Sequence, residues 1–185
     1  MSAGEIPGDK QAVVVNPFGA ADVAEVLASR GWMAVVSERG SDAARGEWFE
    51  RAAFLLGLQV ADLAGLADLL GLVFEYDAAR MMSDVEAHNV MTRYGARDVI
   101  RSLARLVLDG GACTPERFSE IVTAMKAELE SRGRELFHPL RLALAGRSGE
   151  GGLDRVILLI DPAWEAGFAV KTVRERMVEF CSVME

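Results

Sequence analysis

The chain has 185 residues, of which 51% are apolar, and its net charge at pH 7 is -8. This length suits one ordinary domain or two small subdomains, and the apolar content excludes a wholly disordered chain. Proteins that bind mainly to phosphate backbones usually have a strongly basic balance, so the acidity excludes a global attraction to nucleic acid. It leaves room for RNA binding by a local patch of arginines.

Residues 1–18 are predicted to form a flexible leader, within which the apolar run 13–15 is long enough only for a brief strand. The first eleven residues are polar, so they do not read as a signal peptide. Helical spacing of apolar residues starts after Gly19 and predicts a helix that stops before Gly31. The polar interval 37–46 is predicted to be a loop.

The apolar stretch 54–74 is long enough to cross a membrane, but it contains Asp62 and Asp68. An aspartate near the centre of a bilayer costs roughly 3 kcal/mol. We therefore expect two helical pieces running from Trp48 to Phe74 in a soluble, cytoplasmic protein.

The clearest helix starts follow this stretch. Ser83 and Glu86 have the spacing of a capping box, and Gly95 is a natural stop for the helix that this box would open. Residues 99–107 form an apolar stripe that predicts the next helix. Thr114 precedes a proline and an acid, which predicts an N-cap and a helix that ends near Gly133.

Three further helices are predicted at 139–145, 153–160 and 170–184. His138 precedes a proline at the expected start of the first of these helices, so it is interpreted as a cap or packing residue. Asp161 and the following proline are expected to separate the last two.

No segment shows the period-two alternation of a half-buried strand, so the fold class is predicted to be all-α. The expected architecture is a helical bundle of two small subdomains, 19–110 and 111–185. The two cysteines and two histidines are scattered, so neither a metal site nor a disulfide is predicted. No cofactor is expected, and neither DNA nor a membrane is expected as a partner.

Residues 135–153 read ELFHPLRLALAGRSGEGGL, with a helical first half and a glycine-rich turn. This segment resembles a signature of the C-terminal anticodon-binding domain of bacterial glutamyl-tRNA synthetases. The matched positions are Leu136, Phe137, Pro139, Leu140, Arg141, Ala143, Leu144, Gly146, Arg147 and Leu153. A weaker resemblance at 64–77 extends the similarity to about 19–161. Ala145 replaces the usual Thr of the family, and Glu150 with the next glycine replaces its Gly-Pro.

In that family this helix and turn lie beside the anticodon bases, so the resemblance implies a helical anticodon-binding cage and tRNA as the ligand. Arg141 and Arg147 are the leading RNA-binding residues, with Gly146, Leu153 and Arg134 beside them. Residues 132–155 contain five arginines and three acidic residues, a local charge of +2, which leaves -10 for the rest of the chain. Arginine pairs bidentately with phosphate and stacks on unpaired bases. The alternative interpretation is that these arginines form surface ion pairs.

No catalytic residue is predicted. A class I synthetase needs a His-x-Gly-His-like element and a Lys-Met-Ser-Lys-like loop, and the sequence contains neither. The only lysines are Lys10, Lys126 and Lys171, too far apart to share a loop. This chain is therefore not expected to form an aminoacyl adenylate on its own.

Three functions stay open at this stage. The first is a stand-alone anticodon-binding-domain-like protein that binds the tRNA anticodon loop. The second is a protein-interaction module that keeps this fold and docks on a partner such as an aminoacyl-tRNA synthetase, without binding RNA. The third is a C-terminal fragment of a full glutamate–tRNA ligase.

Overall fold

The computed structural model describes residues 15–34, 40–150 and 152–184. Within these ranges the chain consists of helices joined by short connections, and no described segment forms a strand, which confirms the predicted all-α class. The elements in chain order are α1 (Ala20–Arg30), α2 (Asp42–Leu56), the 3-10 turn η1 (Gly57–Gln59), α3 (Leu63–Phe74), α4 (Ala78–Met82), α5 (Val85–Met91), α6 (Ala96–Leu108), α7 (Pro115–Glu128), α8 (Arg134–Ala145), α9 (Leu153–Glu165) and α10 (Val173–Val183).

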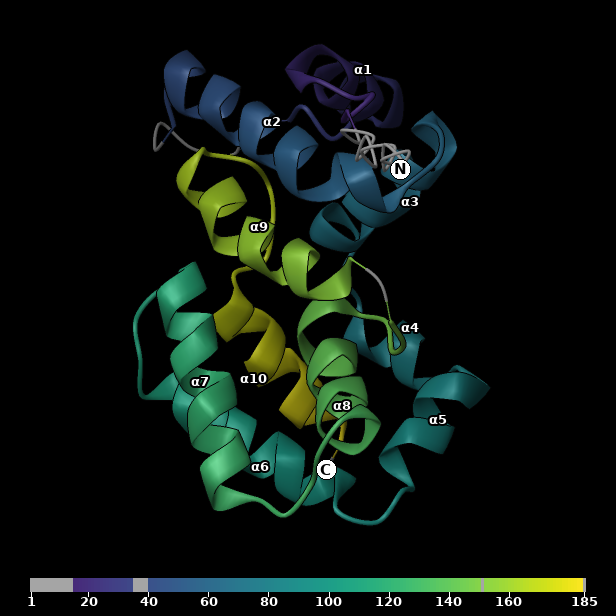
Figure 1. Cartoon of the computed structure of the whole chain (residues 1–185), viewed down its shortest axis with the longest axis vertical. Coiled ribbons are helices and arrows are strands. Elements are labelled where there is room, and N and C mark those ends of the chain that lie inside the picture. Colours follow the sequence, from purple (N-terminus) through teal and green to yellow (C-terminus); the bar gives the residue numbers. More distant parts are fainter. Residues whose placement is uncertain (1–14, 35–39, 151, 185) are drawn as a thin grey trace, which may run out of the picture.

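Helix α9 lies at the centre of the molecule and joins two groups of helices (Figure 1). On one side it packs against α2 and α3, and α1 covers these two. On the other side it contacts α8, which packs with α6 and α10, while α7 lies against α6. Helices before and after residue 110 thus contact each other, and the division into subdomains 19–110 and 111–185 stays a prediction.

The upper part of the core is a cluster of aromatic rings contributed by segments far apart in the chain. Trp48 of α2 lies edge-on to Phe74, with 5.8 Å between ring centroids, and it contacts Phe168 at 5.2 Å. Its indole Nε1 donates to the carbonyl of Leu159 on α9, at 3.0 Å. Trp32 stacks on the other side of Phe74 at 5.3 Å. These rings hold α1, α2, α3 and the end of α9 together.

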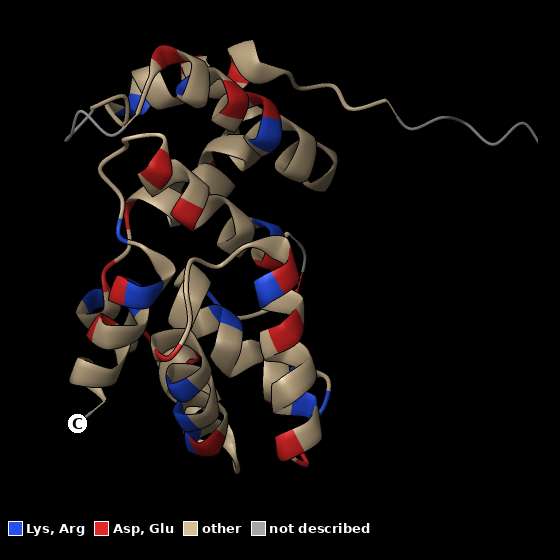
Figure 2. Cartoon of the chain, turned by 90° about the vertical axis from the view of Figure 1, so that its left-hand side faces the viewer, with Lys and Arg blue, Asp and Glu red and all other residues tan. Residues whose placement is uncertain are grey.

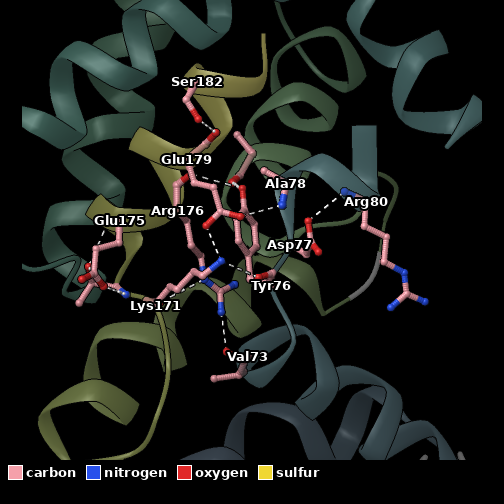
Figure 3. Close-up of polar contacts among 12 residues, drawn as sticks. Val73, Tyr76, Asp77, Ala78, Arg80, Lys171, Glu175, Arg176, Glu179 and Ser182 are labelled. Carbon is pink, nitrogen blue, oxygen red and sulfur yellow. Dashed lines mark hydrogen bonds and ion pairs between the residues drawn. The ribbon is translucent and has the colours of Figure 1, made fainter. Parts of the chain in front are cut away.

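The upper and lower groups of helices are joined by an arginine inside the core (Figure 3). Arg176 of α10 is 0% exposed, and its guanidinium donates to the carbonyls of Leu72, Val73 and Leu144, at 2.9, 2.5 and 2.9 Å. These carbonyls belong to the last turns of α3 and α8, where backbone oxygens have no intrahelical partner and the helix dipole is negative. The guanidinium also lies 4.7 Å from the centre of the Tyr76 ring. Burial lowers the pKa of Arg176 to about 10, so it stays charged at neutral pH.

Several predicted boundaries are confirmed. Helix α1 lies between Gly19 and Gly31, and α3 ends at Phe74. Thr114 is the N-cap of α7, with its hydroxyl accepting from the amide of Arg117 and a proline at the first helical position. The predicted loop 37–46 is too long, because α2 already begins at Asp42; residues 35–39 of it lie outside the described ranges.

The predicted capping box at Ser83 is wrong. Asp84 is the N-cap of α5 and accepts from the amide of Glu86, at 2.7 Å. Ser83 closes α4 instead and donates to the carbonyl of Arg80. Gly95 does not end α5, which stops at Met91; it adopts a left-handed conformation at the start of α6 (φ 80°).

The predicted helix start at Pro139 and the predicted separation at Asp161 and Pro162 are also wrong. Helix α8 begins at Arg134 and continues through Pro139, so His138 lies inside the helix and is not its cap. Helix α9 likewise continues through Pro162 to Glu165. Each proline removes one backbone hydrogen bond. The turns around them persist because they carry fully buried side chains, such as Leu136 and Leu140 before and after Pro139.

The remaining expectations concern the leader, membranes and cysteines. Residues 1–14 of the predicted leader, with most of the strand-like run, lie outside the described ranges. In the described remainder, Asn16 donates to the carbonyl of Ala53, at 2.8 Å. None of the described helices is long and apolar enough to cross a membrane. Within the described residues, neither Cys113 nor Cys181 forms a disulfide.

Candidate functional site

Gly146, Arg147 and Leu153 lie at the two ends of the turn between α8 and α9. Arg134 and Arg141 belong to α8 and reach this turn through their side chains, so the five residues expected to bind RNA have different surroundings. Leu153 is 2% exposed and packs in the core at the start of α9. Gly146 ends α8 in a left-handed conformation (φ 81°), where a Cβ would lie 3.4 Å from the Tyr76 ring. Glycine is favoured there because other residues rarely adopt this conformation.

The three arginines are each paired with a carboxylate. Arg141 binds Asp154 through two parallel hydrogen bonds of 2.7 and 2.8 Å, and it donates to the carbonyl of Gly149, at 2.6 Å. Arg147 binds Asp68 of α3 in the same bidentate way, at 2.6 and 2.9 Å.

Arg134 donates to one oxygen of Glu150, at 2.9 and 3.1 Å, and both of these side chains are largely exposed. The ion-pair interpretation therefore describes all three geometries, and RNA binding by these side chains stays a prediction.

Of these pairs, Arg141–Asp154 has the strongest structural role. Its guanidinium side chain is only 14% exposed and joins α8, the following turn and the first turn of α9. Hydrogen bonding to Asp154 raises the pKa of Arg141 further above its ordinary value. The Arg147–Asp68 pair is more exposed, and hydrogen bonding to Arg147 lowers the pKa of Asp68, so this pair is charged at neutral pH.

These environments give a first expected result. Arg141→Ala is expected to lower the free energy of unfolding by about 2 kcal/mol, since charge-assisted hydrogen bonds in a half-buried site are lost and the carbonyl of Gly149 loses its donor. Arg134→Ala, which removes a pair that is about 70% exposed on each side, is expected to change it by less than about 0.5 kcal/mol. Urea unfolding followed by circular dichroism measures both. Equal losses in the two variants would contradict the assigned roles.

Gly146 and Arg147 line a groove with a volume of about 740 Å³. Its walls come from the end of α1, one face of α3, the segment α4–α5 and the end of α8. Arg30 and Arg80 lie in this lining together with Arg147. In Figure 3 the Arg80 side chain extends away from the contacts around Arg176.

The groove lining contains more acids than arginines. Its carboxylates are Asp68, Glu75, Asp77, Asp84 and Glu86. Each of them already accepts a hydrogen bond from the protein, from Arg147, the Trp32 indole, the amide of Arg80, the amide of Glu86 and the Ser148 hydroxyl respectively.

By contrast, within the described ranges neither the Arg30 nor the Arg80 guanidinium has a hydrogen bond or an ion pair. The side-chain hydrogen-bond donors of the groove that have no partner among the described residues are therefore the guanidinium groups of Arg30 and Arg80.

Sequence reasoning did not find Arg30 or Arg80. Arg30 stands in the last turn of α1, where a cation is favourable for the helix itself, so its position alone gave no functional signal. Arg80 lies in a short helix that the sequence did not predict. Only the tertiary packing, which places α1 against α3 and α4 against α10, brings these side chains to one groove.

The charge distribution outside the groove is mixed. Figure 2 shows acidic and basic residues interspersed along the helices. Among the described residues, no group of three or more His, Cys, Asp or Glu side chains is placed to hold a metal ion.

The chain is similar to part of two bacterial synthetases. It is 25% identical to glutamate–tRNA ligase 2 of Syntrophus aciditrophicus (strain SB) over 127 residues, which are 68% of this chain and 26% of that protein. It is 29% identical to the glutamate–tRNA ligase of Heliobacterium modesticaldum (strain ATCC 51547 / Ice1) over 99 residues, 54% of this chain and 20% of that protein. No known protein family and no solved structure matches the chain. The chain thus contains a synthetase-related region that spans about a quarter of the length of these relatives or less.

Proposed function

We propose that this chain is a tRNA-binding module of the glutamyl-tRNA synthetase type and that it binds the anticodon loop in the groove beside the end of α8. The observation that carries the proposal is a difference between the acidic and basic side chains of that groove. Its carboxylates are engaged by donors of the protein, while Arg30 and Arg80 are free to bind phosphate. The similarity to glutamate–tRNA ligases supports tRNA as the polyanion.

Within these 185 residues the proposed role is recognition without chemistry, since neither class I synthetase motif occurs in the sequence. Arg147 lies in the groove wall and can exchange Asp68 for a phosphate at modest cost, because the pair is about half exposed. Arg141 is better suited to holding the turn that presents Gly146 and Arg147.

Binding to total tRNA, titrated across salt with an unrelated RNA hairpin as competitor, tests the proposal. We expect selective tRNA binding that weakens as salt rises. The double variant Arg30→Ala/Arg80→Ala is expected to weaken binding about tenfold or more at low salt, because two charge-assisted contacts are lost.

The control is Arg45→Ala/Arg51→Ala, which removes two positive charges from α2, outside the groove lining; Arg45 is paired with Asp42. Equal losses in both double variants, or equal affinity for tRNA and hairpin, would refute the groove as an anticodon-loop site.

A protein-interaction module is the second candidate. It is favoured by one observation: five carboxylates against three arginines line the groove, in a chain of net charge -8. A basic segment of a partner, such as an aminoacyl-tRNA synthetase, would complement such a lining. Absence of tRNA binding at low salt, together with saturable binding to a purified synthetase that Asp77→Asn/Asp84→Asn weakens, would favour this candidate over RNA.

A further inference from the structure

A second surface, at the turn between α5 and α6, has the side chains that single-stranded nucleic acid requires. Tyr94 in this turn is fully exposed, so its ring stabilises no part of the core. Arg93 precedes it, and Arg97 follows in the first turn of α6. A cation at a helix N-terminus is unfavourable for the helix dipole, so Arg97 is not placed there for the stability of α6.

The linker between α7 and α8 brings a third arginine to this turn. A Cβ at Gly95 would lie 3.2 Å from the hydroxyl of Ser131, so the two connections are in close contact. Both lie at the lower end of the molecule in Figure 1. Arg132 follows Ser131 and donates to the carbonyls of Leu129 and Ser131, which leaves its charge without a counter-ion.

We call Arg93, Tyr94, Arg97 and Arg132 the Tyr94 patch. In the described part of the chain none of its three arginines has a carboxylate partner, whereas Arg134, Arg141 and Arg147 all do. Arg93 faces the Nδ1 atom of His138 at 3.5 Å, and burial together with the charge of Arg93 lowers the pKa of that histidine. Glu130 and Glu135 are exposed on the neighbouring linker and on α8, so the net charge of the region is only modestly positive.

Helix α5 connects the proposed groove to this patch. It begins beside Asp84 and Glu86 in the groove lining and ends at Met91, two residues before Arg93. At 1.5 Å per residue its seven residues span about 10 Å. Between residues 85 and 95 Glu86 is the only acid, and its carboxylate accepts from Ser148, at 2.5 Å.

We propose that a single-stranded segment of the bound RNA runs from the groove along α5 and stacks one base on Tyr94, while Arg93, Arg97 and Arg132 contact the adjacent phosphates. Exposed aromatic rings flanked by arginines bind unpaired bases and phosphates in this way, largely without regard to sequence. A protein partner would need an apolar surround for such a tyrosine. Among the exposed large apolar residues described, only Val85 lies on α5, and the two connections carry none besides Tyr94 itself.

This inference rests on the proposed tRNA binding, and its test separates the two. Affinity for labelled tRNA at fixed low salt is measured for Tyr94→Ala, Tyr94→Phe and Arg93→Ala/Arg97→Ala. The control Arg101→Ala removes an exposed arginine of the same helix that is already paired with Asp98. We expect Tyr94→Ala to weaken binding about 5- to 100-fold and Tyr94→Phe to retain most of it, because the ring does the stacking. The double arginine variant is expected to lose about one to two phosphate contacts, which lowers the slope of log affinity against log salt concentration by about one to two.

Unchanged tRNA affinity in both Tyr94→Ala and the double arginine variant overturns the patch, even if Arg30→Ala/Arg80→Ala still weakens binding and the groove proposal stands. Equal competition by tRNA and by polyglutamate would indicate a surface for acidic protein and also overturns it. If the wild-type chain does not bind tRNA selectively, the proposed function and the patch both fail. Thermal unfolding by circular dichroism checks that the variants fold, which is expected because Tyr94 is fully exposed.

Discussion

Replacing Arg176 by methionine is expected to lower the free energy of unfolding by about 3–5 kcal/mol, which corresponds to a fall in the melting temperature of roughly 6–20 °C for a domain of this size. The methionine fills part of the volume but donates no hydrogen bond. The carbonyls of Leu72, Val73 and Leu144 would then be left in the core without their donor. Each unsatisfied buried group costs about 1–3 kcal/mol.

Two further variants sharpen this test. Arg174→Met makes the same change on an exposed position of α10 and is expected to shift stability by less than about 0.5 kcal/mol. Arg176→Lys keeps the charge but loses the planar fork that reaches four carbonyls, those of Leu72, Val73, Leu144 and Lys171, so it is expected to recover little. Differential scanning calorimetry measures all three. A melting temperature of Arg176→Met equal to that of Arg174→Met would mean that the core does not depend on the buried guanidinium.

Replacing Trp48 by alanine is expected to cost about 3–5 kcal/mol, the range for removing a large aromatic side chain from a core. Trp48 is 2% exposed, and its ring contacts Phe49, Phe74 and Phe168. Its loss also removes the donor to the carbonyl of Leu159, which joins α2 to α9.

The control for this variant lies on the same helix. Phe54 is 75% exposed, and Phe54→Ala is expected to change stability by less than about 0.5 kcal/mol. Trp48→Phe keeps an aromatic ring but not the indole N–H and is expected to lose about half as much as Trp48→Ala. Urea unfolding curves decide the point, and comparable midpoints for Trp48→Ala and Phe54→Ala would show that α2 does not depend on this contact.

Much of the fold was predictable because it is encoded by local patterns. The helix start at Thr114 follows from two features. Its hydroxyl accepts from the amide of Arg117, and the proline after it lacks an N–H group at the first helical position, where that group would have no partner in the helix. The end of α1 at Gly31 follows from the left-handed conformation that glycine adopts there. The errors have a common cause. Pro139 and Pro162 weaken their helices locally, but buried neighbours such as Leu136, Leu140 and Ile160 favour continuing them.

Arg176 shows what the spacing of apolar residues in a helix can indicate and what it cannot. It lies on the apolar face of α10 with Val173, Met177 and Phe180, all of them buried, and an arginine on such a face signals a polar partner inside the core. Besides the nearby carbonyl of Lys171, its partners are carbonyls about 30 and 100 residues away, at the ends of α8 and α3. Local periodicity contains no information about them.

The same limit applies to the candidate site. By itself the sequence determined the helical class, the motif of residues 135–153 and the excess of arginine around it. The tertiary structure alone decided which arginines are already paired. Arg147 meets Asp68 from 79 residues away, while Arg30 and Arg80 reach the same groove unpaired. The physical reason is that charge pairing depends on distances of a few ångströms between segments remote in the chain, and only the packing of the helices sets those distances.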